Sequence, residues 1–182
     1  MADVAEKYNA QAIKITGATS IAIVDLDEEH IDQVWDELQL EKGAAVGLCV
    51  RSIGACPGTT FCKVDRQEAL GVGMELDKRY HEKELPGKFK MAVSGCHLSC
   101  AGSWVRDIGL IGKKDGWTVV IGGNVGAEPR IAEELVSGLN DAGVLQVVDK
   151  LVQCYHENAK KRERLGKTIE RIGMAPFEDV IK

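Results

Sequence analysis

Two pairs of cysteines constrain this chain of 182 residues more than any other feature of its sequence. Cys56 and Cys62 have five residues between them, and Cys96 and Cys100 have three. Four thiolates on two short segments can hold one metal centre, and four cysteines are the usual ligand set of a 4Fe-4S cluster. The sequence therefore points first to a metal site built from these two pairs.

Other roles for the four cysteines fit less well. Structural zinc sites favour pairs separated by two to four residues, which suits Cys96 and Cys100 but not the wider first pair. The sequence lacks the C-x2-C-x2-C run of bacterial ferredoxins. Disulfide frameworks are typical of small secreted chains, and residues 1–11 carry no apolar signal segment. The spacing thus favours an iron–sulfur cluster and leaves structural zinc open as the alternative.

The residues around both pairs resemble a known family. Residues 51–58 (Arg-Ser-Ile-Gly-Ala-Cys-Pro-Gly) and 88–96 (Lys-Phe-Lys-Met-Ala-Val-Ser-Gly-Cys) are similar to nitrite and sulfite reductases, and the similarity runs from about Ile13 to the C-terminus. The resemblance implies that C-x5-C and C-x3-C ligate a 4Fe-4S cluster. It also implies that Cys100 bridges this cluster to the iron of a sirohaem. The length resembles that of the small members with a single repeat.

The same resemblance implies a set of basic site residues. In the family an arginine before the first cysteine and two lysines before the second pair contact substrate oxygens, and Arg51, Lys88 and Lys90 match them. Lys88 and Lys90 alternate on a predicted strand, so they share one face, which favours a common role over two solvated lysines. A sirohaem carries many carboxylates, so its pocket needs cations and donors. Further candidates for those contacts are Arg106, Asn124 and Arg130.

Two positions depart from the family pattern. Ala18-Thr19 stands where members often carry an arginine–glutamine pair, so a substrate-contacting arginine is missing. His97-Leu98 replaces the usual proline–asparagine after Cys96, and His97 is a candidate either for proton donation or for a structural role. These changes leave the cysteine pattern intact and bear on the substrate and the rate.

The composition limits the partners. Hydrophobic content of 45% and charged content of 28% are ordinary for a soluble globular protein. A net charge of -5 argues against nucleic acid, because phosphate binding needs a basic surface. No apolar run approaches the ~20 residues of a membrane span. We expect a cytoplasmic protein without nucleic-acid or membrane partners, in which Cys49 and Cys154 are small buried hydrophobic side chains.

The N-terminal residues 1–43 are predicted to form a ferredoxin-like half-domain. Ile13–Ile15 and Ile21–Val24 read as strands that meet at a turn around Gly17. Asp25 with Glu28 has the form of a capping box. The helix that follows places on one face Ile31, Val34, Trp35 and Leu38. Residues 41–43, Glu-Lys-Gly, are the predicted boundary.

Residues 44–182 are predicted to form the domain that holds the cofactors. The fold class is α+β, with a mixed or antiparallel sheet and helices, because strands and helices do not alternate regularly. The predicted strands lie at 44–50, 89–93, 104–111 and 117–121, with a hairpin turn at Asp115-Gly116. The predicted helices lie at 64–80, 129–139 and 142–158, and the charged run 160–164 is predicted as a solvated helical surface.

The leading hypothesis is a small oxidoreductase that reduces sulfite or nitrite with six electrons. No flavin or nicotinamide motif is visible, so we expect electrons from a separate ferredoxin, flavodoxin or reductase subunit. One alternative is a sirohaem and iron–sulfur protein that transfers electrons or binds cofactor without physiological turnover, and another is a zinc-stabilised interaction module. Larger relatives carry two repeats, and a homodimer through the N-terminal strands would rebuild that arrangement.

Overall fold

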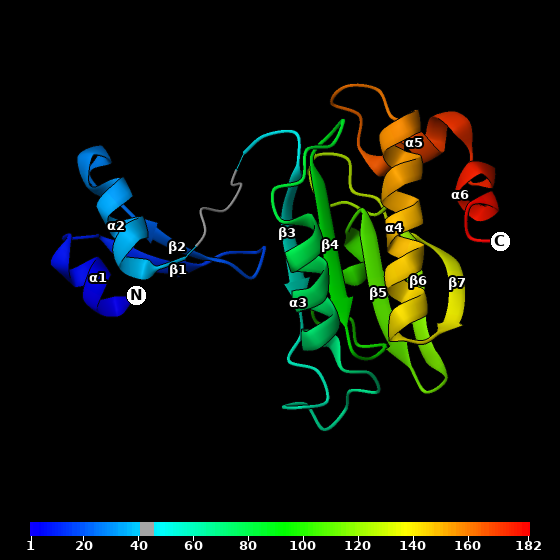
Figure 1. Ribbon diagram of the computed structural model, residues 1–182, viewed down its shortest axis with the longest axis horizontal. Helices are drawn as coiled ribbons and strands as arrows, with labels where there is room; N and C mark the ends of the chain where they lie inside the picture. Colours follow the sequence, from blue (N-terminus) through cyan, green and yellow to red (C-terminus); the bar gives the residue numbers. More distant parts are fainter. Residues whose placement is uncertain (41–45) are drawn as a thin grey trace. The chain divides into compact units, whose positions relative to one another are not determined.

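The computed structural model describes residues 1–40 and 46–182. The chain divides into two compact units, residues 1–43 and 44–182 (Figure 1). The boundary predicted at residues 41–43 lies outside the described residues.

The N-terminal unit combines a two-stranded antiparallel sheet with short helices. Strands β1 (Ala12–Ile15) and β2 (Ile21–Val24) confirm the two predicted strands, and their pairing runs from Ala12 opposite Val24 to Ile15 opposite Ile21. The helical elements are α1 (Ala2–Lys7), η1 (Glu28–His30) and α2 (Ile31–Leu38), and α2 buries Val34 as its spacing predicts.

The predicted capping box of this unit is wrong. Asp25 has a φ of 66°, in the left-handed region, and lies outside the helical segment. The helical segment begins after Asp27, whose side chain makes no capping hydrogen bond. The spacing of Asp25 and Glu28 correctly indicated that a helical segment begins in this region. It did not predict the hydrogen bonds at that start.

The second unit is built on a mixed five-stranded sheet, as predicted. Its strands lie side by side in chain order: β3 (Val50–Ala55), β4 (Phe89–Ser94), β5 (Ile108–Lys113), β6 (Gly116–Ile121) and β7 (Glu133–Leu139). The first three strands are parallel, and the last two add in antiparallel fashion. A tight turn between Lys113 and Gly116 joins β5 to β6 and confirms the predicted hairpin.

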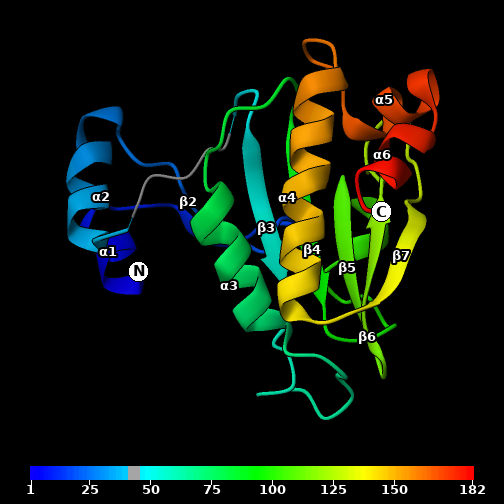
Figure 2. The ribbon, with the colours of Figure 1, turned by 45° about the vertical axis from the view of Figure 1, so that its right-hand side comes forward.

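Helices α3 (Ala69–Tyr80) and α4 (Asp141–Asn158) cover one face of this sheet (Figures 1 and 2). Each begins at a side-chain cap: Glu68 accepts from Gly71 N and Asn140 from Gly143 N. The core between sheet and helices takes alternate residues of the central strands, among them Phe89, Met91, Val93, Trp117, Val119 and Ile121. Helices α5 (Leu165–Ile172) and α6 (Ala175–Asp179) follow α4.

The segment after the second cysteine pair packs against β5. It contains η2 (Ser103–Val105), and Ser103 Oγ donates to Leu110 O at 2.9 Å. A Cβ on Gly109 would lie 2.1 Å from Ser103 O, so only glycine permits this approach. Ser94 Oγ and Ser103 Oγ are 2.8 Å apart, which ties β4 to the same segment.

Two predicted strands begin later than expected, and two other predicted elements are wrong. Residues 44 and 45 of the strand predicted over 44–50 lie outside the described residues, and within them the strand begins at Val50, while the strand predicted from Trp104 begins at Ile108, after η2. The helix predicted over 129–139 is strand β7, because pairing with β6 overrides the helical spacing of its apolar residues. The charged run 160–164 is not helical but connects α4 to α5. Helices α3 and α4 and strand β4 confirm their predictions.

Candidate metal centre and anion site

The parallel pairing of β3 with β4 brings the two cysteine segments together. Ala55 lies opposite Val93, so both strands deliver their cysteines at the same edge of the sheet. Cys56 N donates to Val93 O at 3.0 Å. Gly95 N donates to Cys56 Sγ at 3.1 Å. The first cysteine of one pair is therefore in contact with the residue that precedes the first cysteine of the other.

A turn at Pro57-Gly58 shapes the first cysteine segment, as predicted. Gly58 has a φ of 70°, and its carbonyl accepts from Cys62 N at 2.9 Å. A Cβ on Gly58 would lie 2.4 Å from Glu68 Oε1 and 2.8 Å from Ala69 N, so glycine is required where this loop passes the start of α3. The turn folds the five intervening residues back and shortens the gap between Cys56 and Cys62.

The groups around the buried cysteines act on their thiols in opposite directions. Burial raises the pKa of the Cys56 thiol, while N–H groups of Gly95 and Gly58 oppose that rise. Such N–H donors stabilise the thiolate, which is the form that binds metal. Asp65 Oδ2 lies 3.3 Å from Cys56 Sγ, and after burial Asp65 also raises the pKa of Cys96. The sequence gave no sign of this carboxylate beside both cysteines.

A single zinc ion and a cluster make different demands on the spacing of four thiolates. Two sulfurs bound to one zinc ion are at most about 4.6 Å apart, because each Zn–S bond is about 2.3 Å. Among the described residues, the group of ligand atoms that all lie within 4.8 Å of one another is Asp27, Glu29 and His30, an exposed acidic turn. A cubane binds each thiolate to a different iron, so its four sulfurs can lie further apart than those around one zinc ion. All six cysteines of the chain are free of disulfides.

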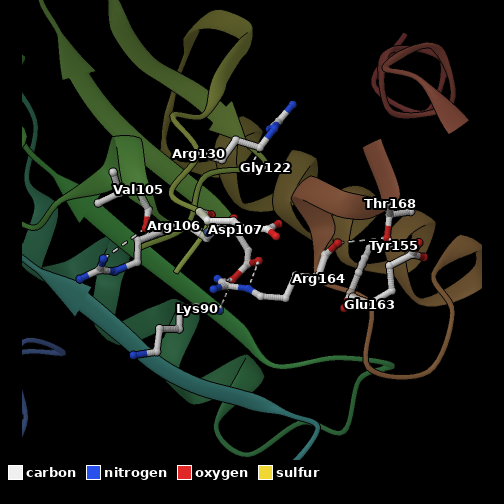
Figure 3. A network of polar contacts seen from close by, with 12 residues as sticks. Lys90, Val105, Arg106, Asp107, Gly122, Arg130, Tyr155, Glu163, Arg164 and Thr168 are labelled. Carbon is white, nitrogen blue, oxygen red and sulfur yellow. Dashed lines mark hydrogen bonds and ion pairs between the residues drawn. The ribbon is translucent and has the colours of Figure 1, made fainter. Parts of the chain in front are cut away.

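A second set of candidate residues gathers near the amino ends of β3 and β4. We call it the basic group. It consists of the predicted residues Arg51, Lys88, Lys90 and Arg106, together with Arg164, which was not predicted. The pKa of Lys90 is lowered first by burial and then by the positive charges of the other four. Figure 3 shows Lys90, Arg106 and Arg164 around one acid, Asp107. Mutually repelling cations form a site that an anion can stabilise.

The basic group and the cysteines lie at opposite ends of β4. Lys90 is the second residue of the strand, and Cys96 follows its last residue by two positions. At about 3.3 Å per residue the chain between them spans roughly 20 Å. Because a strand is the most extended form of the chain, this length is an upper limit on the distance between Lys90 and Cys96.

The three predicted carboxylate-binding residues differ in their surroundings. Arg106 is half-buried within the basic group, and its pKa is lowered by burial and by Arg164. Asn124 Nδ2 donates to Glu128 O at 2.7 Å and closes its own loop. Arg130 Nη1 donates to Gly122 O at 2.8 Å, and its other nitrogens face Glu133 and Glu170. Only Arg106 of the three shares the charged environment of Lys90.

Two polar residues of this region escaped the sequence analysis. Asp107 is completely buried directly before β5, and its carboxylate pairs with Arg164. An acid at the head of an apolar strand was a signal that could have marked Asp107. Arg164 lay in a charged run that looked like solvated surface, and nothing local distinguished it.

The fold and the paired cysteines together point to an iron–sulfur oxidoreductase. The family described as "Nitrite and sulphite reductase 4Fe-4S domain" matches residues 46–182, and its "ferredoxin-like half domain" matches residues 1–41. The chain belongs to the nitrite and sulfite reductase family. This confirms the predicted family and fold, and the 4Fe-4S cluster and sirohaem are the cofactors of that family.

Known proteins similar to the chain agree with this membership. It is 37% identical to the assimilatory-type sulfite reductase of Nitratidesulfovibrio vulgaris, over 98% of this chain and 82% of that protein. It is 33% identical to the nitrite reductase [NAD(P)H] of Bacillus subtilis, over 100% of this chain but 22% of that longer protein. The crystal structure of dissimilatory sulfite reductase I has the same fold, with a TM-score of 0.86 at 14% identity, over 98% of this chain and 64% of that one. None of the helices in the described ranges is long and apolar enough to cross a membrane.

Proposed function

We propose that this protein reduces sulfite to sulfide, with nitrite as the second candidate substrate. The relative whose length the chain nearly matches is a sulfite reductase, which favours sulfite. The nitrite reductase of Bacillus subtilis is similar across the whole chain, which keeps nitrite as an alternative. Reduction of sulfite consumes six electrons and six protons and releases three waters. The site must therefore supply charge compensation and protons as well as electrons.

The four paired cysteines hold the cluster in this proposal. Cys56, Cys62, Cys96 and Cys100 are its ligands, and Cys100 also binds the sirohaem iron. These cofactors supply an electron store and an iron that binds the oxyanion. The N–H donors of Gly95 and Gly58 oppose the rise in the pKa of Cys56 that burial causes, and they can stabilise its thiolate once a metal binds. Exposure of Cys100 leaves its sulfur accessible to a second group.

The basic group binds the oxyanion and delivers protons. Arg51, Lys88 and Lys90 act on the substrate oxygens, and Arg106 acts on sirohaem carboxylates. Asn124 and Arg130 remain predicted carboxylate contacts, although both are engaged within their own loop. A pKa lowered by burial brings Lys90 closer to the range in which an ammonium group can release its proton. Positioned positive charges are strongest where they meet charge that develops during the reaction.

Electrons come from an external donor, and a ferredoxin, a flavodoxin and a reductase subunit are the candidates. We also propose a cytoplasmic location and a homodimer formed through the N-terminal strands. The two-stranded sheet exposes Ile13 to 45%, Ile15 to 79% and Ile21 to 50%, which is the apolar surface that such a contact would use. Light scattering of the cofactor-loaded protein at micromolar concentration tests this assembly, and a monomer would contradict it.

The observation that carries the proposal is the cysteine arrangement at the paired ends of β3 and β4, with Arg51 and Lys90 of the basic group on the same two strands. The test is the absorption spectrum of anaerobically purified protein, with iron and sulfide analysis and turnover using a reduced artificial donor. We expect a sirohaem spectrum, a 4Fe-4S content and sulfide production. A colourless, zinc-loaded protein would contradict the assignment. A sirohaem spectrum without turnover would favour an electron-transfer or cofactor-binding role.

A further inference from the structure

Asp107 is the one completely buried acid in the described part of the chain. Arg164 holds its carboxylate from two directions, with Nε 3.1 Å from Oδ1 and Nη2 2.5 Å from Oδ2 (Figure 3). The backbone N–H of Lys90 donates to Oδ2 at 2.8 Å. A buried carboxylate is costly unless it is paired and hydrogen-bonded, so the location of Asp107 depends on Arg164.

The backbone of Asp107 is bonded to the same part of the site. Asp107 N donates to Lys90 O at 3.0 Å, and Gly122 N donates to Asp107 O at 2.8 Å. Both peptide groups of Lys90 that face Asp107 are thus bonded to this one residue. Asp107 therefore holds the Lys90 backbone on one side, while the pairing of Lys90 with Ser52 of β3 holds it on the other.

The segment that carries Arg164 also packs against the residues before Lys88. Arg162 N donates to Pro86 O at 2.7 Å, and Tyr155 Oη donates to Glu163 O at 2.6 Å. A Cβ on Gly87 would lie 2.3 Å from Glu163 O, so the two segments are in direct backbone contact. The connection between α4 and α5 therefore supports the chain on both sides of the two predicted catalytic lysines.

The positive charge of Arg164 also affects the pKa values of Lys90 and Arg106. Its positive charge lowers the pKa of Lys90 and, after burial, that of Arg106, while Asp107 opposes the shift at Arg106. Burial raises the pKa of Asp107, and Arg164 opposes that rise. The groups that act on Lys90 are therefore Lys88, Arg106, Arg164 and Arg51, with the Asp107 carboxylate at its backbone N–H.

We propose that Arg164 is a positioning residue of the anion site, which acts through Asp107 to fix Lys90 and the basic group in place. The inference rests on the proposed function for its kinetic consequence and on the contacts of Asp107 for its structural one. Arg164, which lies on the connection between α4 and α5, therefore supports the reductase site without touching the substrate.

The test compares Arg164→Gln and Arg164→Lys in the cofactor-loaded protein, with Arg171→Gln as the matched control. Arg171 lies seven residues further on and pairs with Glu163 rather than with Asp107. Steady-state reduction of sulfite gives kcat and KM. The ionisation of Lys90 is followed separately by NMR of 13C-methylated lysines, with Lys90→Arg to assign the signal.

For Arg164→Gln we expect KM for sulfite to rise at least about tenfold and kcat/KM to fall about 10²-fold, because the reacting groups are displaced. The pKa of Lys90 should rise, since a nearby cation is lost. Arg164→Lys should recover only part of kcat/KM, because it keeps the charge but loses the two-point contact with Asp107. Arg171→Gln should change neither quantity. If Arg164→Gln does not fold, the neutral pair Asp107→Asn/Arg164→Gln replaces it, and the same changes are expected.

Unchanged KM, kcat/KM and Lys90 ionisation in a folded Arg164→Gln protein would overturn the proposal and reduce the ion pair to a stabilising contact. Failure of the proposed function looks different. In that case wild type produces neither sulfide nor ammonia, and the Lys90 titration alone decides: a shifted pKa supports the positioning role, and an unshifted one overturns it.

Discussion

Two sets of basic side chains in the second unit differ in what surrounds them. In the basic group, four cations act on Lys90 and lower its pKa after burial, and the one carboxylate that the group contacts, the buried Asp107, pairs with Arg164. The α5 network, defined as Arg130, Lys167 and Arg171 with their acids, pairs each cation with carboxylates: Glu128, Glu133, Glu163 and Glu170. Cations that are already neutralised hold structure together, whereas cations held close at an electrostatic cost are suited to bind an anion.

The largest expected effect is the loss of both cofactors when one of their proposed ligands is replaced. Cys100→Ser should lose the spectra of both the cluster and the sirohaem, because the residue is the proposed ligand to both. Cys154→Ser is the control, since Cys154 is buried in α4, far along the chain from the paired cysteines. Absorption spectra with iron and sulfide analysis give the result. Equal losses in both variants would mean that the cluster ligands are wrongly assigned.

The next effect separates the two sets of cations directly. Lys90→Gln should lower kcat/KM for sulfite about 10²-fold, because a positioned cation near developing charge is typically worth that much. Lys167→Gln removes an exposed lysine from the α5 network and should leave kcat/KM unchanged, since its pairs with Glu128 and Glu170 lie at the surface. Steady-state kinetics of the two variants measure this difference in kcat/KM. Comparable losses in both would erase the distinction between the sets.

A smaller effect is expected from adding a cation to the N-terminal unit. Ala18→Arg restores the residue type that the family often carries at this position, and we expect a gain in kcat of about tenfold, less than a positioned cation can supply. Turnover of sulfite and of nitrite with a strong artificial donor measures it. Ala18→Gln serves as a control for side-chain size. A fast wild type that gains nothing from the arginine would show that the existing basic group is sufficient.

The smallest effect concerns the α5 network and stability. A hydrogen bond from Arg171 is the main reason that the pKa of Glu163 is lowered to about 2, from its ordinary 4.5. A lowered pKa in the folded state stabilises the protein above pH 4.5, and this contribution is lost as pH falls toward 2. Glu163→Gln should therefore lower Tm at pH 6, with the difference from wild type shrinking below pH 4.5. A difference that stays constant with pH would rule out this ionisation as its source.

The sequence predicted those parts of the site that carry local signals. The cysteine pairs have a diagnostic spacing, and the apolar alternation around Lys90 predicted strand β4, which begins directly after Lys88. Strand β7 was not predictable in this way, because its apolar spacing suits a helix and only pairing with β6 makes it a strand. The contact of Asp107 with Arg164 joins residues 57 positions apart, so no local pattern announces it. Strand β7 and the Asp107–Arg164 contact both depend on residues far apart in the sequence, so local patterns do not predict them.

The most direct test of the account is the electron balance of sulfite reduction by the cofactor-loaded protein. Sulfite is supplied to anaerobic enzyme with a measured amount of reduced donor, and sulfide is quantified. We predict one sulfide for every six electrons consumed, with KM raised strongly in Lys90→Gln and not in Lys167→Gln. A protein that carries both cofactors in full and yields neither sulfide from sulfite nor ammonia from nitrite would contradict the account.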